Sequence, residues 1–227
     1  MYWFLVLHKD FGARRGDLAE VKGRNIGAAP WVDMGLRRLL IAAGMDRERD
    51  NIRIAPVPGA QGAGVNFGLM AARALEERKI DGFWANGMAA EIAVKAGIGT
   101  VVLDVRRGDG PPACFNYTMA SIAATDRMIA ERPEAAAAAV RAIVKAQAAL
   151  REDVSRAAEV GRKLFPGPEA GLITALIERD LPYYDARISP AFVAGMSRFA
   201  QDLGLIERPL TYEQVVATQF TPLWKAP

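Results

Sequence analysis

Cysteine and histidine, which often serve nucleophilic catalysis and metal binding, occur once each in this 227-residue chain, as Cys114 and His8. A Ser-His-Asp triad would have to use His8. His8 ends an apolar run and precedes Lys9 and Asp10, a setting that favours a surface imidazole. One cysteine excludes an intrachain disulfide and a cysteine-based metal site. We therefore expect no catalytic residue, no metal centre, no cofactor and no enzymatic activity.

A loop between a predicted strand and a predicted helix holds the residues best suited to contact a ligand. Its small residues let a ligand approach the backbone, and the first N–H groups of the helix are free to bind it. Core packing explains a large aromatic side chain such as Trp31 poorly in this loop. The ligand-binding candidates are Ala29, Pro30, Trp31 and Asp33. The alternative is a plain strand-to-helix turn.

Further ligand-binding candidates lie later in the chain. Trp84 and Asn86 stand at the carboxyl end of a predicted strand, and open α/β sheets bind ligands outside such ends. Trp84 either contacts a ligand or packs on a helix, and Asn86 either hydrogen-bonds a ligand or caps the next helix. Asn116 and Tyr117 either orient a ligand or bond neighbouring strands.

Charged residues bear on the chemistry of the ligand. Asp33 at the start of a helix would repel an inorganic anion, and the face of Trp31 favours a flat ring or a cation. The sequence therefore predicts a neutral or amine-bearing organic ligand. Arg106, Arg107 and Asp109 lie in a connection rich in glycine and proline, which predicts a solvated loop.

Short apolar segments alternate with helical patterns in the first half of the chain. Strands are predicted at Tyr2–Leu7, Arg24–Ala29, Asn51–Val57, Asp81–Ala85 and Gly99–Val105, and helices at Val32–Ala43, Val65–Arg78 and Gly87–Ala96. This alternation predicts an α/β fold with a mainly parallel sheet that helices cover on both faces. Gly44 and Gly97 are expected to end two of the helices.

The second half of the chain is predicted to be helical. Pro133 opens a long alanine-rich helix, and Thr211 with Gln214 forms a capping-box pattern. Further helices are predicted at Asp153–Leu164, Pro168–Asp180 and Ser189–Leu203. We therefore divide the chain into an α/β lobe, residues 1–118, and a helical remainder, residues 119–227.

Charge argues against a nucleic-acid-binding protein, and hydropathy argues against a membrane-spanning segment. The net charge is only +3, and the paired arginines are dispersed and not interleaved with aromatic residues, so we expect no nucleic-acid partner. No segment reaches the roughly 18 apolar residues that a transmembrane helix needs. The chain as given opens directly on an apolar run, and no signal peptide precedes that run.

Three stretches of the chain carry a family resemblance. They read DLAEVKGRNIGAAPWVDMGLRRLLIAAGMD, KIDGFWANGMAAEIAVKAG and ACFNYTMASIAATDRMIAERPEAAAAAVRAIVKAQAAL. In order and spacing they resemble the substrate-binding proteins of nitrate/sulfonate/taurine-type ABC transporters, a group that overlaps the thiamine-pyrimidine-precursor-like proteins. The resemblance covers nearly the whole chain.

This resemblance implies a periplasmic binding protein type II-like fold, with two lobes joined by a double crossover. Tyr2–Leu7 would form the first crossing, and Cys114–Met119 would form the second. The resemblance also implies a periplasmic solute-binding protein, which captures a small organic ligand between its lobes. Its protein partners would be the membrane subunits of an ABC importer.

The chain departs from the family at its start. Family members usually begin with an additional βα segment, so the first lobe is expected to be incomplete. If the chain truly begins at Met1, apolar residues such as Val140, Ile143 and Val144 would be exposed, and we then expect a homo-oligomer. Two alternative functions are an enzyme of pyrimidine-precursor synthesis and a ligand-sensing regulatory domain. The single cysteine and single histidine disfavour the enzyme.

Overall fold

The computed structural model describes residues 4–60, 62, 65–116, 121–165 and 167–225. The chain forms two compact units. The first comprises Met1–Thr118 and Arg198–Glu207, and the second comprises Met119–Ser197 and Arg208–Pro227. Residues 198–207, which the sequence-based division assigned to the helical remainder, therefore belong with the α/β unit.

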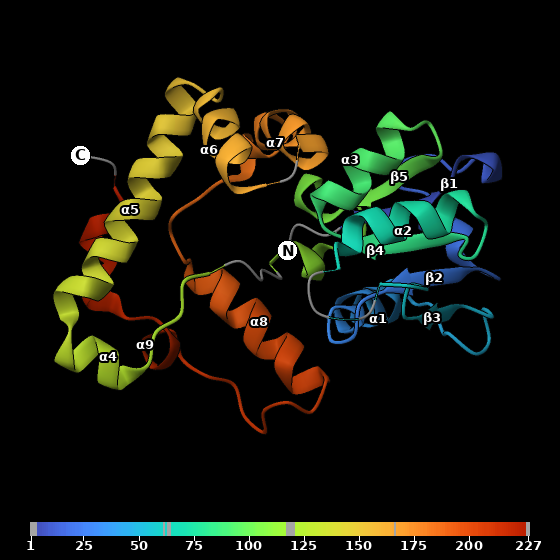
Figure 1. The fold of residues 1–227 in the computed structure, drawn as a ribbon. Coiled ribbons are helices and arrows are strands. Elements are labelled where there is room, and N and C mark those ends of the chain that lie inside the picture. Colours follow the sequence, from blue (N-terminus) through green and yellow to red (C-terminus); the bar gives the residue numbers. More distant parts are fainter. Residues whose placement is uncertain (1–3, 61, 63–64, 117–120, 166, 226–227) are drawn as a thin grey trace. The chain divides into compact units, whose positions relative to one another are not determined.

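The first unit is built on one five-stranded sheet with the strand order β3-β2-β4-β1-β5 (Figure 1). The strands are β1 (Phe4–His8), β2 (Asn25–Ala28), β3 (Arg53–Ala55), β4 (Gly82–Ala85) and β5 (Gly99–Asp104). β2 is parallel to β3 and β4, whereas β1 is antiparallel to both of its neighbours, β4 and β5. The predicted α/β class is confirmed, but the sheet is mixed and not mainly parallel, because two of its strand pairings are parallel and two are antiparallel. The reversed direction of β1 was not predicted.

Helices cover both faces of this sheet, because the connection from β3 to β4 turns back across β2. Right-handed connections then place α1 (Asp33–Ala42) on one face and α2 (Phe67–Glu76) and α3 (Gly87–Lys95) on the other (Figure 1). Strand side chains alternate between the two faces. Phe83 lies in a core cluster with α2 and α3, so its neighbour Trp84 points to the opposite face.

Local signals set the ends of these helices. The side chain of Asn66 accepts a hydrogen bond from the Leu69 N–H at 3.2 Å and caps α2. Gly44 and Gly97 follow α1 and α3 with φ angles of 73° and 65°, which is the left-handed conformation that favours glycine. Gly82 is required for another reason: a Cβ atom there would lie 2.5 Å from the Val6 carbonyl oxygen on β1.

Helices are the regular secondary structure among the described residues of the second unit. Its elements are α4 (Asp126–Glu131), α5 (Pro133–Glu152), α6 (Arg156–Leu164), α7 (Gly167–Asp180), most of α8 (Pro190–Asp202) and α9 (Tyr212–Val215). Pro133 opens α5, and the capping box of Thr211 and Gln214 is formed. A small core joins Ala136 and Ala137 of α5 to Phe220.

The three apolar residues of α5 that the sequence singled out differ in exposure. Val144 is buried, Val140 is half-buried against the core around Phe220, and Ile143 is 44% exposed. None of the described helices is long and apolar enough to cross a membrane.

Short 3₁₀ helices make up several of the connections. They are η1 (Lys9–Phe11), η2 (Leu18–Val21), η3 (Val105–Arg107), η4 (Pro112–Asn116), η5 (Leu181–Tyr183) and η6 (Thr218–Trp224). The second crossing, predicted at Cys114–Met119, therefore begins in a 3₁₀ helix and not in a strand. Pro112 is the first residue of this helix, and its fixed φ angle suits the start of a helix. Tyr117, Thr118 and Met119 lie outside the described residues.

Candidate functional site

A surface hollow of about 220 Å³ lies at the carboxyl ends of β2 and β3. We call it the Trp31 hollow. Its lining residues are Ala28, Pro30, Trp31, Asp33, Arg37, Ile54, Ala55 and Pro56. Open α/β sheets bind ligands outside the carboxyl ends of their strands, and the hollow includes three of the four residues predicted for this loop.

The loop from β2 into α1 explains the shape of the hollow. β2 ends at Ala28, and the carbonyl of Ala29 accepts a hydrogen bond from the Asp33 N–H at 3.0 Å, which closes the turn onto the first residue of α1. Ala29 thus shapes the loop with its backbone. The ring of Pro30 fixes its own φ angle, so the chain reaches Trp31 along a restricted path.

Trp31 is held in an unusual conformation with its side chain in solvent. Its φ angle is 69°, in the left-handed region, and 77% of its surface is exposed. A bulky residue with positive φ is a genuine outlier, and such strain gathers at ligand-binding positions. Burial contributes little to holding a side chain that is mostly exposed, so packing does not explain the strain.

Two charged side chains of α1 line the same hollow. Arg37 Nε lies 2.6 Å from Asp33 Oδ2, and the side chains are 32% and 21% exposed. Residues four apart face each other on a helix, so the sequence contained the signal for Arg37, which sequence reasoning missed. The hollow therefore presents an aromatic face, a carboxylate and a guanidinium above an apolar floor.

The hollow is small for a ligand pocket. Ligand pockets for organic molecules commonly enclose about 300–1,000 Å³ and cover most of the ligand. The Trp31 hollow measures about 220 Å³ and leaves the ring of Trp31 uncovered. A bound organic molecule would be enclosed only if a second surface closed over Trp31.

The other sequence candidates are not brought into the hollow. Trp84 is completely buried in the core, and its Nε1 has no hydrogen-bond partner among the described residues; its expected ligand contact is replaced by packing. Asn86 is exposed and caps α3, accepting a hydrogen bond from the Ala89 N–H at 3.4 Å. Asn116 is the last residue of η4, but its side chain and Tyr117 lie outside the described part of the chain.

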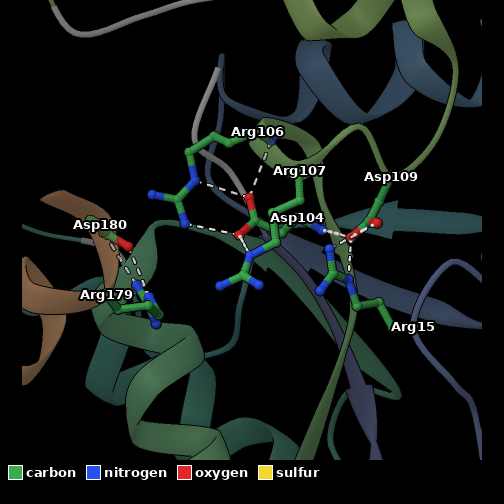
Figure 2. A network of polar contacts seen from close by, with 7 residues as sticks. All are labelled: Arg15, Asp104, Arg106, Arg107, Asp109, Arg179 and Asp180. Carbon is green, nitrogen blue, oxygen red and sulfur yellow. Dashed lines mark hydrogen bonds and ion pairs between the residues drawn. The ribbon is translucent and has the colours of Figure 1, made fainter. Parts of the chain in front are cut away.

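A second group of charges stands at the carboxyl end of β5. We call it the Asp104 cluster, and Figure 2 shows it. Its members are Asp104, Arg106, Arg107, Asp109 and Arg15. Arg106 donates from Nε to Asp104 Oδ1 and from Nη2 to Asp104 Oδ2, both at 2.9 Å. Their side chains are only 7% and 4% exposed.

Further contacts complete the Asp104 cluster. Arg107 Nε donates to Asp104 Oδ2 at 3.2 Å, and the backbone N–H of Asp104 donates to Asp109 Oδ2 at 3.1 Å. Arg15 donates to both oxygens of Asp109, and the guanidinium of Arg106 stacks on the Phe4 ring at 4.8 Å. The solvated loop predicted for these residues is wrong for Arg106 and Asp109, whose side chains are 7% and 15% exposed, whereas the side chain of Arg107 is 38% exposed.

The single cysteine and single histidine are both buried in the first unit. Burial raises the pKa of the Cys114 thiol to about 11, so the thiol is protonated at neutral pH. His8 is only 5% exposed, which corrects the predicted surface imidazole. Its Nδ1 accepts a hydrogen bond from the Asp10 N–H, and burial followed by the charge of Arg78 lowers the pKa of His8.

The comparisons with known proteins bear on the fold. No protein-family model and no curated protein matches the chain. A solved structure of a protein from Bordetella bronchiseptica RB50 is similar, with 20% sequence identity and a TM-score of 0.62 over 96% of this chain and 67% of that chain. At this identity the likeness shows the mixed α/β fold alone.

Proposed function

We propose that this chain is a solute-binding protein that captures a small organic molecule at the Trp31 hollow for an ABC importer. The observation that carries the proposal is Trp31 itself. It is a strained, 77% exposed tryptophan above a hollow at the carboxyl edge of the sheet. An aromatic side chain kept in this position has no role in packing, and it offers a face on which a ligand can stack.

The physical mechanism is differential binding. A ligand that rests in the hollow contacts one wall only, and it gains further contacts when a second surface closes over it. Binding therefore shifts the population from an open to a closed conformation, as in hinged two-lobe binding proteins. The type II fold with two lobes and a double crossover is part of this proposal. The antiparallel strand β1 supports it, because a strand that enters from elsewhere is free to run against the others.

The partner and the location in this proposal come from the family resemblance of the sequence. The closed, loaded form would dock on the membrane subunits of an ABC importer, and the protein would work in the periplasm. The second unit would present part of the surface that these subunits recognise.

Binding without catalysis is favoured by where the reactive residues lie. His8 pairs with Gly99 at the start of β5. His8 therefore lies at the end of the strands opposite the hollow. Cys114 is buried and protonated. Neither residue lines the hollow, so a ligand held there would meet the carboxylate of Asp33 and the guanidinium of Arg37.

Native mass spectrometry of the purified chain tests the proposal. We expect a bound small molecule that Trp31→Phe retains and that Trp31→Ala weakens about tenfold, since stacking and burial of an aromatic ring exceed 1 kcal/mol. Ile41→Ala is the matched control, because Ile41 is an exposed apolar residue on α1 outside the hollow. Retention that is insensitive to Trp31→Ala would contradict the proposed site.

A further inference from the structure

The charged pair in the Trp31 hollow is joined by a single contact. Arg37 uses Nε to reach Asp33 Oδ2 at 2.6 Å. Among the contacts of the described residues, Asp33 Oδ1 and the terminal nitrogens Nη1 and Nη2 of Arg37 take no part. One acceptor atom and one two-pronged donor therefore remain for a ligand, on side chains that the pair already holds in place.

The electrostatic balance of the hollow narrows the ligand further. A ligand with only a negative charge would compete with Asp33 for Arg37, and a ligand with only a positive charge would compete with Arg37 for Asp33. In both cases one member of the pair would lose its partner as the hollow was covered, and an unpaired buried charge is costly. A ligand that carries both charges leaves neither member unpaired.

We propose that the ligand is a small zwitterion, with an ammonium group on Asp33 Oδ1 and a carboxylate or sulfonate on the terminal nitrogens of Arg37. This inference rests on the proposed function of the hollow, and it narrows the neutral or amine-bearing ligand expected from the sequence. An acid group of this shape accepts two parallel hydrogen bonds from a guanidinium. The apolar part of the ligand packs against Trp31 and Ile54, which line the same hollow.

Calorimetric titration of the full chain with four probes tests the ligand class. The probes are L-phenylalanine, taurine, 2-phenylethylamine and 3-phenylpropanoate. L-Phenylalanine has a ring and both charges, and the two phenyl compounds each lack one charge. We expect L-phenylalanine to bind at least about tenfold more tightly than either, because a hydrogen bond to a charged group is worth that much. Taurine separates a sulfonate without a ring from a carboxylate with one.

Two variants assign the charges to their residues. Asp33→Asn should reduce the affinity for L-phenylalanine about tenfold and shift the preference toward 3-phenylpropanoate. Arg37→Met should shift it toward 2-phenylethylamine. A merely structural role of the pair would lower the affinity for all probes alike. Arg73→Met is the matched control, because Arg73 pairs with Glu77 four residues away at 2.8 Å on α2, outside the hollow.

Each result decides the inference. Tight binding of a singly charged probe, equal loss for all probes in the two variants, or no binding of L-phenylalanine or taurine at millimolar concentration would overturn the zwitterion. The proposed function fails separately, when no small molecule retained by the purified chain depends on Trp31. Circular dichroism at the titration temperature shows that each variant is folded.

Discussion

The Trp31 hollow lies at the carboxyl ends of β2 and β3, and the Asp104 cluster lies at the carboxyl end of β5, which is the same end of the sheet. Each region contains an Asp–Arg pair. In the cluster, Arg106 makes two hydrogen bonds to Asp104, and both side chains are less than a tenth exposed. The backbone N–H of Asp104 also donates to the carboxylate of Asp109. In the hollow the pair makes one contact, is partly exposed and stands beside a strained tryptophan. The kind of residue does not separate a scaffold from the proposed binding site here, whereas the completeness of its hydrogen bonding does.

The largest expected effect breaks the scaffold. Asp104→Asn removes the buried carboxylate to which Arg106 makes two hydrogen bonds, so the free energy of unfolding should fall by about 3–5 kcal/mol. Asp33→Asn breaks a partly exposed pair four residues apart and should cost only about 0.3–0.5 kcal/mol. Urea unfolding followed by circular dichroism measures both. Equal losses in the two variants would remove the distinction between the two regions.

The left-handed backbone at Trp31 predicts a smaller effect on stability, in which glycine is favoured over alanine. Trp31→Gly should be more stable than Trp31→Ala by about 1 kcal/mol, because a left-handed backbone penalises every residue that has a Cβ atom. Ile41 in α1 supplies the opposite case, since glycine in a helix should be less stable than alanine there by about 0.5–1 kcal/mol. Thermal unfolding of the four variants makes the comparison. An alanine variant at position 31 as stable as the glycine variant would contradict the strain.

The smallest expected effect concerns His8, which lies at the end of the strands opposite both the hollow and the cluster. The folded state lowers the pKa of His8 below its ordinary value of 6.5. Its contribution to stability is therefore present above pH 6.5 and is lost as the pH falls through 6.5 toward the lowered value, because the unfolded chain takes up the proton first.

In the wild type, the urea midpoint should be lower at pH 5.5 than at pH 7.5. The difference should shrink in His8→Asn, whose side-chain oxygen still accepts the hydrogen bond from Asp10 but does not titrate over this range. A variant with the full pH dependence would show that other groups cause it.

Local chemistry explains what the sequence could predict. Asn66, Asn86 and Gly44 mark helix ends through contacts within a few residues, so their roles follow from the nearby sequence. The hollow was predictable in part for the same reason, because a strand, a loop with Pro30 and Trp31, and a helix are neighbours in the chain. Asp33 was identified, and Arg37, one helical turn later, was within reach of the same argument.

The wrong predictions concern residues whose contacts cannot be read from the nearby sequence. Trp84 stands at a strand end like other site residues, but the pleat of β4 turns its side chain into the core, and a strand buried on both faces carries no alternating pattern to reveal this. The cluster at Asp109 depends on Arg15, which is 94 residues away in the sequence. Only the pairing of β1 with β5 brings Phe4 under Arg106.

The position of β1 between β4 and β5 has a consequence for biosynthesis. Phe4 pairs with Ala85 on one side and with Asp104 on the other, so β1 leaves the ribosome well before either of its neighbours. At 5–20 residues per second, β5 emerges about 5–20 s after β1. Both edges of β1, whose first four residues are apolar, stay unpaired until β4 emerges, and one edge stays unpaired until β5 emerges. Unpaired strand edges are a condition under which nascent chains associate with one another or with chaperones. The pairing of β1 with β4 and β5 thus gives the sheet a high contact order, and the first unit should fold only after translation passes Asp104.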